Sequence, residues 1–259
     1  MMNILKELTE MRRRDAAIRE AVTPFDEMVR RAESTSTPRD FAAAFLGAGV
    51  HVIAELKRAS PSEGMIREDF RPVELAQELE AAGAAALSVL CEPHRFLGDE
   101  EYLRTVRGEV YLPILYKDFV STRYQVAAAR AAGADAVLLI AAVLDDSALK
   151  DLICFADGLG LSALVETHDG HEIERAVQAG AKIVGVNCRD LRDFSTDVSL
   201  LESLVPEIPR PCLRIAESGM RSLEAVRRAQ AVGADGFLVG TVLMRAQRPG
   251  DRLKELMTT

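Results

Sequence analysis

The chain has 259 residues, of which 48% are hydrophobic, so it is long enough for one large domain with an aliphatic core. Its 40 acidic residues outnumber its 32 basic ones, and a net charge of −8 argues against nonspecific binding to nucleic acid or to anionic membranes. The four cysteines are widely spaced and the N-terminus lacks the apolar core of a signal peptide, which predicts reduced thiols in a cytoplasmic protein.

Residues 1–50 are predicted to be helical and to precede the first strand. Apolar residues at helical spacing predict a helix over residues 2–20, with Arg12 to Arg14 on a solvated face. The pairs Thr23-Pro24 and Thr37-Pro38 predict the starts of two further helices, the second over residues 39–46. We therefore expect an N-terminal helical extension, separate from the domain formed by residues 51–259.

The stretch HVIAELKRASPSEG, residues 51–64, is predicted to begin as a strand. Alternation places Val52, Ala54 and Leu56 on one face and leaves Glu55 and Lys57 side by side on the other, at the C-terminal end. The following run of Ser, Pro and Gly, residues 60–64, is predicted to be a loop.

After this strand, amphipathic helical stretches alternate with short apolar runs. Runs that are apolar on both faces are typical of a parallel sheet covered by helices. Four similar joins, such as AAGADAV at 131–137, place a Gly just past a helix and directly before a strand. The helices are expected at Arg71–Ala82, Asp99–Arg107, Thr122–Ala132, Ser147–Leu159, His171–Ala179, Ser199–Leu204, Ser222–Val232 and Asp251–Met257. The strands after the first are expected at Ala85–Leu90, Leu112–Tyr116, Ala136–Ile140, Ala163–Val165, Lys182–Val186, Leu213–Ala216 and Gly236–Val239.

Eight strands that alternate with eight helices predict an α/β fold with a single (βα)8 TIM barrel. The alternative is an open doubly wound sheet. The chain has no G-x-G-x-x-G after a strand, so no dinucleotide fingerprint favours that alternative.

Polar residues gather at the predicted C-terminal ends of the strands, where the active site of such a barrel lies. Residues two or four positions earlier are mostly apolar or small, which predicts that the polar ends point inward at the mouth. Burying this many charges costs stability unless they pair or bind a ligand, so the pattern favours function. The residues are Glu55, Lys57, Ser88, Lys117, Glu166, Asn187, Arg189, Glu217 and Ser218.

Two joins add a possible phosphate site. Ser218-Gly219 follows the seventh strand and Gly240-Thr241 follows the eighth, and these two loops commonly bind phosphate in such barrels. His168 and His171 lie three positions apart, but Thr167-His168-Asp169 is more typical of a loop that caps a helix than of a metal site. Phe96, Phe119, Leu138 and Leu191 are typical of core or loop anchors and, near a polar mouth, could form an aromatic-binding wall.

Several blocks resemble the indole-3-glycerol phosphate synthase family over essentially the whole chain. The blocks are AELKRASPSEG (54–64), LSVLCEPHRFLG (87–98), YKDF (116–119), ALVETH (163–168), GVNCRDL (185–191), AESGM (216–220) and FLVGTVLM (237–244). The resemblance implies conversion of 1-(2-carboxyphenylamino)-1-deoxyribulose 5-phosphate to indole-3-glycerol phosphate, with loss of CO2 and water, in tryptophan biosynthesis. It implies no metal or organic cofactor, and N-terminal helices that cover the barrel mouth.

The resemblance also implies roles for individual residues. Lys117 is similar to the family's general acid, Glu166 to the group that transfers protons in the dehydration, and Lys57 to the lysine at the substrate carboxylate. Glu55 and Asn187 would orient these groups, while Arg189 and Glu217 would contact substrate. The phosphate site would comprise Ser60, Gly219, Gly240 and Thr241 with Ser218 beside it, and the anthranilate ring would pack on Phe96, Phe119, Leu138 and Leu191.

The chain departs from the family pattern at Cys91, Cys188, Tyr116 and the run Pro93-His94-Arg95, none of which has an implied chemical role. An isomerase-like barrel acting on phosphoribosylanthranilate is a second reading, but it lacks the ELKRxSPSxG strand. A catalytically silent barrel used as a scaffold is a third. We expect a phosphorylated small-molecule substrate, no nucleic-acid or membrane partner, and a monomer, with a dimer as the alternative.

Overall fold

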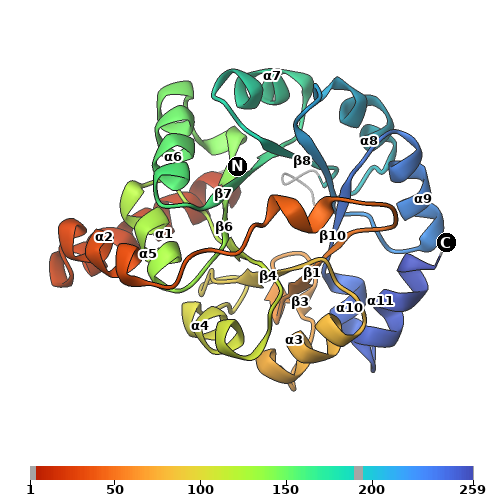
Figure 1. Ribbon diagram of the computed structural model, residues 1–259, viewed down its shortest axis with the longest axis horizontal. Helices are drawn as coiled ribbons and strands as arrows, with labels where there is room; N and C mark the ends of the chain where they lie inside the picture. Colours follow the sequence, from red (N-terminus) through yellow and green to blue (C-terminus); the bar gives the residue numbers. More distant parts are fainter. Residues whose placement is uncertain (1–3, 190–194, 259) are drawn as a thin grey trace.

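A closed parallel barrel forms the centre of the molecule (Figure 1). The computed structural model describes residues 4–189 and 195–258. Within these ranges, eight parallel strands close in the order β1-β10-β9-β8-β7-β6-β5-β4, so the predicted (βα)8 barrel is confirmed. The strands are β1 (Val52–Leu56), β4 (Ala86–Leu90), β5 (Ile114–Lys117), β6 (Ala136–Ile140), β7 (Ser162–Thr167), β8 (Ile183–Asn187), β9 (Leu213–Glu217) and β10 (Gly236–Val239).

Helices surround the barrel, and local sequence explains where they begin and end. The side chains of Asp99, Thr122, Asp145, Asp169 and Ser222 each accept a backbone N–H at a helix N-terminus. The glycines of the four repeated joins have φ between 93° and 95°, as predicted for the left-handed position past a helix. The helices are α3 (Pro72–Ala81), α4 (Glu100–Glu109), α5 (Arg123–Ala131), α6 (Asp146–Gly158), α7 (Gly170–Gln178), α8 (Ser199–Leu204), α9 (Leu223–Ala231), α10 (Thr241–Arg245) and α11 (Pro249–Met257), with 3-10 turns η2 (Ala141–Val143) and η3 (Val205–Glu207).

Strand alternation separates two hydrophobic clusters. Val52, Ala54 and Leu56 pack outward in the cluster beneath the helices, as predicted. Ile53 points inward and, with Leu115 and Leu164, belongs to the cluster that fills the barrel. Because the inner positions near the C-terminal strand ends are polar, this filling stops below a polar layer at the mouth.

Among the described residues before β1, three helical elements lie at different places on the barrel. The first, α1 (Ile4–Val22), contributes Leu5 and Leu8 to the cluster inside the barrel. The second, α2 (Phe25–Ser34), packs against α5 on the outside. The third is the short 3-10 turn η1 (Ala42–Phe45), so the helix predicted over residues 39–46 is wrong in type and length.

Phe41 and Phe45 close the end of the barrel where the strands begin. Both are buried in the cluster inside the barrel. The ring of Phe45 lies so close to Gly236, the first residue of β10, that a Cβ there would be 2.6 Å from it. The backbone N–H of Arg39, just upstream, donates to Asp135 Oδ1 at 2.6 Å, directly before β6. Residues 39–45 therefore contact the N-terminal strand ends, while Leu5 reaches the C-terminal ends.

The loop predicted after β1 is confirmed over residues 61–63 and wrong at its two ends. Residues 60–64 were expected to form a loop, but Ala59–Ser60 and Gly64–Met65 pair as the antiparallel strands β2 and β3. The chain turns back through Pro61, Ser62 and Glu63, with Gly64 at φ 64°. This hairpin holds Ser60 in a buried position next to the end of β1.

Two further findings concern the thiols and the helices. All four cysteines lie in the described ranges and are free. Over those same ranges, no helix combines the length and apolar character that crossing a bilayer requires.

Candidate active site

One cavity opens at the C-terminal ends of the barrel strands, and it gathers nearly all the predicted site residues. Leu191 is the exception, because it lies outside the described residues. Ser88 is fully buried beneath the mouth and does not line the cavity. The predicted residues around the cavity are Glu55, Lys57, Ser60, Phe96, Lys117, Phe119, Leu138, Glu166, Asn187, Arg189, Glu217, Ser218, Gly219, Gly240 and Thr241.

Glu55 and Lys57 form an ion pair at the end of β1. Lys57 Nζ lies 2.6 Å from Glu55 Oε2, and both side chains are nearly buried. The Glu55 carboxylate also packs directly against Gly240, the residue after β10. A Cβ on Gly240 would lie 2.1 Å from Glu55 Oε2. The absence of a side chain at Gly240 therefore makes room for the carboxylate that holds Lys57 in place.

Lys117 at the end of β5 is held by two carboxylates. Its Nζ lies 2.8 Å from Glu217 Oε2 on β9 and 3.1 Å from Glu166 Oε2 on β7. Burial acts to lower the pKa of the Lys117 ammonium, but the charges of Glu217, Glu166 and Glu55 outweigh it and raise that pKa above its ordinary value. Lys117 is therefore a charged donor at neutral pH, in a site largely shielded from water.

The two carboxylates around Lys117 have different surroundings. Burial acts to raise the pKa of Glu166, but the charges of Lys117 and His168, with a hydrogen bond from Asn187, lower it overall. Glu217 is 1% exposed and its Oε1 has no hydrogen-bond partner among the described residues. Burial and the nearby charge of Glu166 raise the pKa of Glu217 despite Lys117. Such a pair of unequal carboxylates beside one ammonium is suited to proton transfer.

A chain of polar contacts crosses from β8 to the hairpin after β1. Ser218 Oγ donates to Asn187 Oδ1 at 2.7 Å, and Arg189 Nη1 donates to Ser62 Oγ at 2.9 Å. Ser62 Oγ lies 3.4 Å from Ser60 Oγ. Ser62 was predicted only to lie in a loop, because its contact with Arg189, 127 positions away, cannot be read from local spacing.

The turn after β9 is unusually shaped. Ser218 and Gly219 both have left-handed backbones, with φ of 66° and 72°. A Cβ on Gly219 would lie 2.7 Å from Val198 Cγ2, so glycine is required there on both grounds. A non-glycine residue such as Ser218 in this conformation is uncommon outside functional sites.

The other side of the cavity is apolar. The rings of Phe96 and Phe119 are tilted with their centroids 6.2 Å apart. Phe96, Phe119 and Leu138 were predicted for this wall. Leu5 was not, because it comes from α1, and Leu90, Ile140 and Leu238 were not, because they sit at ordinary core positions. The remaining apolar residues of the wall include Leu5, Leu90, Leu138, Ile140 and Leu238.

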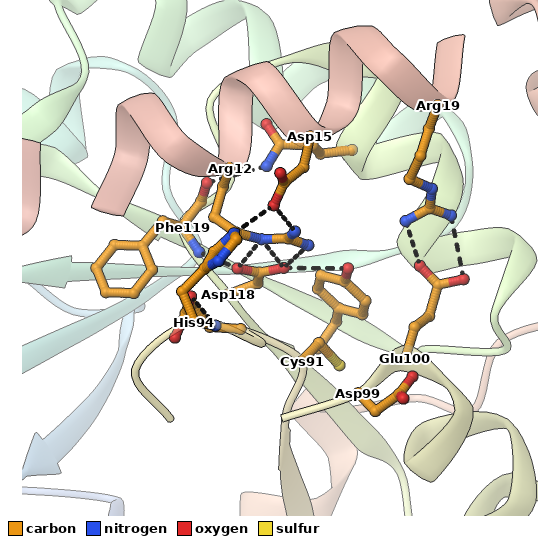
Figure 2. A network of polar contacts seen from close by, with 12 residues as sticks. Arg12, Asp15, Arg19, Cys91, His94, Asp99, Glu100, Asp118 and Phe119 are labelled. Atoms are coloured by element: carbon orange, nitrogen blue, oxygen red, sulfur yellow. Dashed lines mark hydrogen bonds and ion pairs between the residues drawn. The ribbon is translucent and has the colours of Figure 1, made fainter. Parts of the chain in front are cut away.

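A polar network joins α1 to the segment that follows β5 (Figure 2). Arg12 Nε and Nη2 donate to the carboxylate of Asp118, which directly follows Lys117, at 2.6 to 3.1 Å. Arg12 Nη1 also donates to Asp15 Oδ2, which is 2.7 Å from His94 Nε2. The prediction of a solvated Arg12 is wrong: Arg12 is 7% exposed. Its spacing of four from Leu8 and from Ala16, both on the buried stripe of α1, was the signal for burial.

The neighbouring histidines do not share a site. His168 contacts the carboxylates of Glu166 and Glu172, whereas His171 is exposed. Asp169 caps α7, as the helix-cap interpretation predicts. Across the described residues, no group of three or more His, Cys, Asp or Glu side chains is arranged to hold a metal ion.

The closed barrel, with buried lysine–carboxylate groups at its C-terminal strand ends, defines a (βα)8-barrel enzyme. A family model described as indole-3-glycerol phosphate synthase matches residues 5–256. The chain belongs to the indole-3-glycerol phosphate synthase family.

Curated relatives agree along the full length. The chain is 44% identical over 260 residues to an indole-3-glycerol phosphate synthase of Acidithiobacillus ferrooxidans, covering 99% of both chains. It is 45% identical over 256 residues to one of Streptomyces griseus, covering 99% of this chain and 95% of that one. It is similarly 44% identical over 257 residues to one of Campylobacter jejuni, covering 98% and 100%.

Solved structures of low identity share the fold. An N-acetylmannosamine-6-phosphate 2-epimerase from Clostridium perfringens superposes with a TM-score of 0.61 at 18% identity, covering 80% of this chain and 93% of that one. A thiamine phosphate pyrophosphorylase from Pyrococcus furiosus superposes with a TM-score of 0.58 at 18% identity, with the same coverage. At this identity the likeness concerns the fold alone.

Proposed function

We propose that this cavity converts 1-(2-carboxyphenylamino)-1-deoxyribulose 5-phosphate to indole-3-glycerol phosphate, with release of CO2 and water. The chain is thereby a carboxy-lyase of tryptophan biosynthesis. The observation that carries the proposal is the Lys117 ammonium, held by Glu166 and Glu217 at the mouth of a barrel whose sequence belongs to this family.

The first chemical step is ring closure. The aryl carbon that bears the carboxylate attacks the ketone carbon, and the ketone oxygen becomes basic as the new bond forms. Lys117 donates a proton to this oxygen. Its two carboxylate partners keep it charged and fix its position, so the donor is already oriented when substrate enters.

Decarboxylation and dehydration follow. The bond to the carboxylate breaks, CO2 leaves, and the electron pair restores the aromatic ring. Glu166 then takes a proton from the carbon beside the hydroxyl-bearing carbon and delivers one to the departing hydroxyl. A carboxylate with a pKa held low by Lys117 and His168 is ionised at neutral pH, as the base in this step must be.

Charge and shape support a definite orientation of the substrate. The substrate carboxylate faces Lys57, which Glu55 positions, and the anthranilate ring packs on the wall around Phe96 and Phe119. The phosphate lies at the opposite side, near Ser60 and the turns after β9 and β10. Asn187 orients Glu166, and Arg189 and Glu217 contact the substrate between these two ends.

We assign α1 the role of covering the mouth above the aryl end of the substrate. Leu5 lines the cavity, and Arg12 ties the helix to Asp118. In this arrangement the residues before β1 form a helical extension that serves the barrel, while residues 51–259 provide the chemistry.

The test uses the absence of tryptophan. The chain has no Trp and four Tyr, so an indole product is visible by its emission against an almost dark enzyme. Adding the carboxyphenylamino substrate to the purified chain should produce growing indole emission. Folded enzyme that gives no emission would instead support the silent-barrel reading.

A further inference from the structure

We propose that His168 and Glu172 form a proton relay that acts through Glu166 and returns to Lys117 the proton consumed in each turnover. His168 lies one residue beyond β7, and Glu172 lies in the first turn of α7. This inference rests on the proposed function, because that reaction sets the need for a proton.

Contacts connect Glu172, His168, Glu166 and Lys117 in that order. Glu172 Oε2 lies 3.1 Å from His168 Nδ1 and also accepts the backbone N–H of His168 at 2.8 Å. The other ring nitrogen, Nε2, is buried, lacks a hydrogen-bond partner among the described residues, and faces Glu166 Oε1 at 3.5 Å. The second oxygen of Glu166 contacts Lys117. A carboxylate only accepts, so Glu172 keeps a proton on Nδ1 and leaves Nε2 directed at Glu166.

The reaction creates a demand for one proton. The ketone oxygen gains two protons on its way to water, and the neighbouring carbon loses one. The loss of the carboxylate as neutral CO2 balances the charge, so each turnover takes up one proton from solution. Lys117 supplies the first proton, and Glu166 carries the carbon's proton to the hydroxyl. The cycle therefore ends with neutral Lys117 and ionised Glu166.

The relay restores the starting state. His168 passes a proton from Nε2 to Glu166 Oε1, and Glu166 passes one to Lys117 Nζ. The neutral imidazole ring then rotates so that its unprotonated nitrogen faces Glu172, which transfers a proton from solution to it. Neither His168 nor Glu172 lines the substrate cavity, yet their side chains are 19% and 13% exposed, so they meet water outside it. A bound substrate or product therefore leaves this route open.

The charges around His168 suit this role. Burial acts to lower the pKa of His168, but Glu172, Glu166 and Glu217 outweigh it and raise that pKa above its ordinary value. The imidazole can thus hold a proton near neutral pH and release it to Glu166 once Lys117 has lost its own. His168 acts through Glu166 without touching substrate, so it is a positioning and proton-supply residue.

The experiment compares one turnover with many in His168→Gln, which keeps a hydrogen-bonding side chain that cannot carry a proton. With enzyme in excess, indole emission in the first turnover should form at close to the wild-type rate. With substrate in excess, kcat should fall on the order of 10²-fold, the lower end of what a positioned proton-transfer group contributes. This kcat should rise with the concentration of a small buffer acid, while wild type shows no such dependence. Glu172→Gln should behave in the same way.

The matched control is His171→Gln, three residues further on and exposed, which should equal wild type in both regimes. An equal loss in the first and later turnovers would show that His168 only holds Glu166 in place, and this would overturn the relay. Unchanged kcat in His168→Gln would overturn it as well. A wild-type enzyme that produces no indole would instead refute the proposed function.

Discussion

Arg12 and Asp118 are 106 positions apart in the chain and form a buried ion pair, with Arg12 Nη2 2.6 Å from Asp118 Oδ2 (Figure 2). Asp118 also accepts from Tyr116 at 3.2 Å and from the backbone N–H of Phe119 at 2.8 Å. Lys117 lies between Tyr116 and Asp118 in sequence, so a contact from α1 fixes the backbone on the C-terminal side of the proposed acid. The position of Phe119 in the aromatic wall depends on the same carboxylate.

Breaking this pair should destabilise the protein strongly. Arg12→Met keeps much of the volume but leaves the buried Asp118 carboxylate without its cation, which costs about 3–5 kcal/mol in comparable cases. Urea unfolding measures the loss. Arg12→Met combined with Asp118→Asn should recover part of it. The control is Arg14→Met, which removes an exposed pair with Glu10 and should change stability by less than about 1 kcal/mol. Equal effects of Arg12→Met and Arg14→Met would contradict the prediction.

Removing the Lys117 ammonium should abolish most of the chemistry. We expect Lys117→Ala to lower kcat on the order of 10²–10⁴-fold, because a positioned acid contributes that much, while a product analogue still binds. The assay is indole emission, with calorimetry for the analogue. Lys182→Ala, which removes an exposed lysine paired with Asp157, should leave kcat and binding of the product analogue unchanged. Near-normal kcat in Lys117→Ala would remove this residue from the mechanism.

The opposite pKa shifts of Glu166 and Glu217 should appear in the pH dependence of the free energy of unfolding. Burial and Glu166 raise the pKa of Glu217 from 4.5 to about 7 in the folded protein, despite the opposing charge of Lys117. A folded state that binds more protons than the unfolded chain loses stability as pH rises. The free energy of unfolding should therefore fall between about pH 5 and about pH 7, by at most about 1.4 kcal/mol per pH unit from this group.

Urea unfolding across this range tests the assignment. Glu217→Gln should remove the decline, and Glu224→Gln on the exposed side of α9 should retain it. Glu166 has the opposite effect, because its pKa is lowered from 4.5 to about 2 in the folded protein. The stability that ionised Glu166 contributes is therefore present at neutral pH and is lost as the pH falls from about 4.5 toward 2. A wild-type stability that rises from pH 5 to 7 would contradict the raised pKa of Glu217.

A single added methyl group at Gly185 should disturb the site without altering any charge. A Cβ there would lie 2.1 Å from Glu217 Oε1, so the carboxylate must move relative to Lys117. We expect Gly185→Ala to lower kcat on the order of 10²-fold, as small misplacements do. The control is Gly108→Ala in α4, where nothing lies within 4 Å of the new methyl group. It should leave kcat unchanged, and its helix should gain about 1 kcal/mol. Equal kcat in both variants would show that Glu217 need not hold its position.

Local periodicity predicted the barrel because its strands and helices repeat a short pattern. Each of the eight barrel strands lies within two residues of its predicted bounds. The polar strand ends converge on the cavity because parallel strands in a closed barrel share one C-terminal end.

Contacts between residues far apart in the chain could not be predicted from local sequence patterns. Arg12 reads as solvated in a run of three arginines, whereas its buried partner Asp118, directly after β5, is 106 positions away in the chain. Likewise, neighbouring residues in the sequence do not explain why Tyr116, His94 and Arg95 depart from the family pattern. In the structure, Tyr116 contacts the partner of Arg12, His94 contacts Asp15, and Arg95 contacts Glu7, so all three face the polar network of α1.

The position of Phe45 against Gly236 has a consequence for how the chain is made. Phe45 emerges from the ribosome long before the strand that it packs on, and β1 likewise waits for β10, its neighbour through Val52 and Phe237. Until residue 240 has been synthesised, Phe45 cannot pack against Gly236 and Glu55 cannot pack against Gly240. Contacts between such distant segments slow folding and leave apolar surface exposed in the meantime. The growing chain therefore completes its substrate cavity only after β10 and Gly240 have been synthesised.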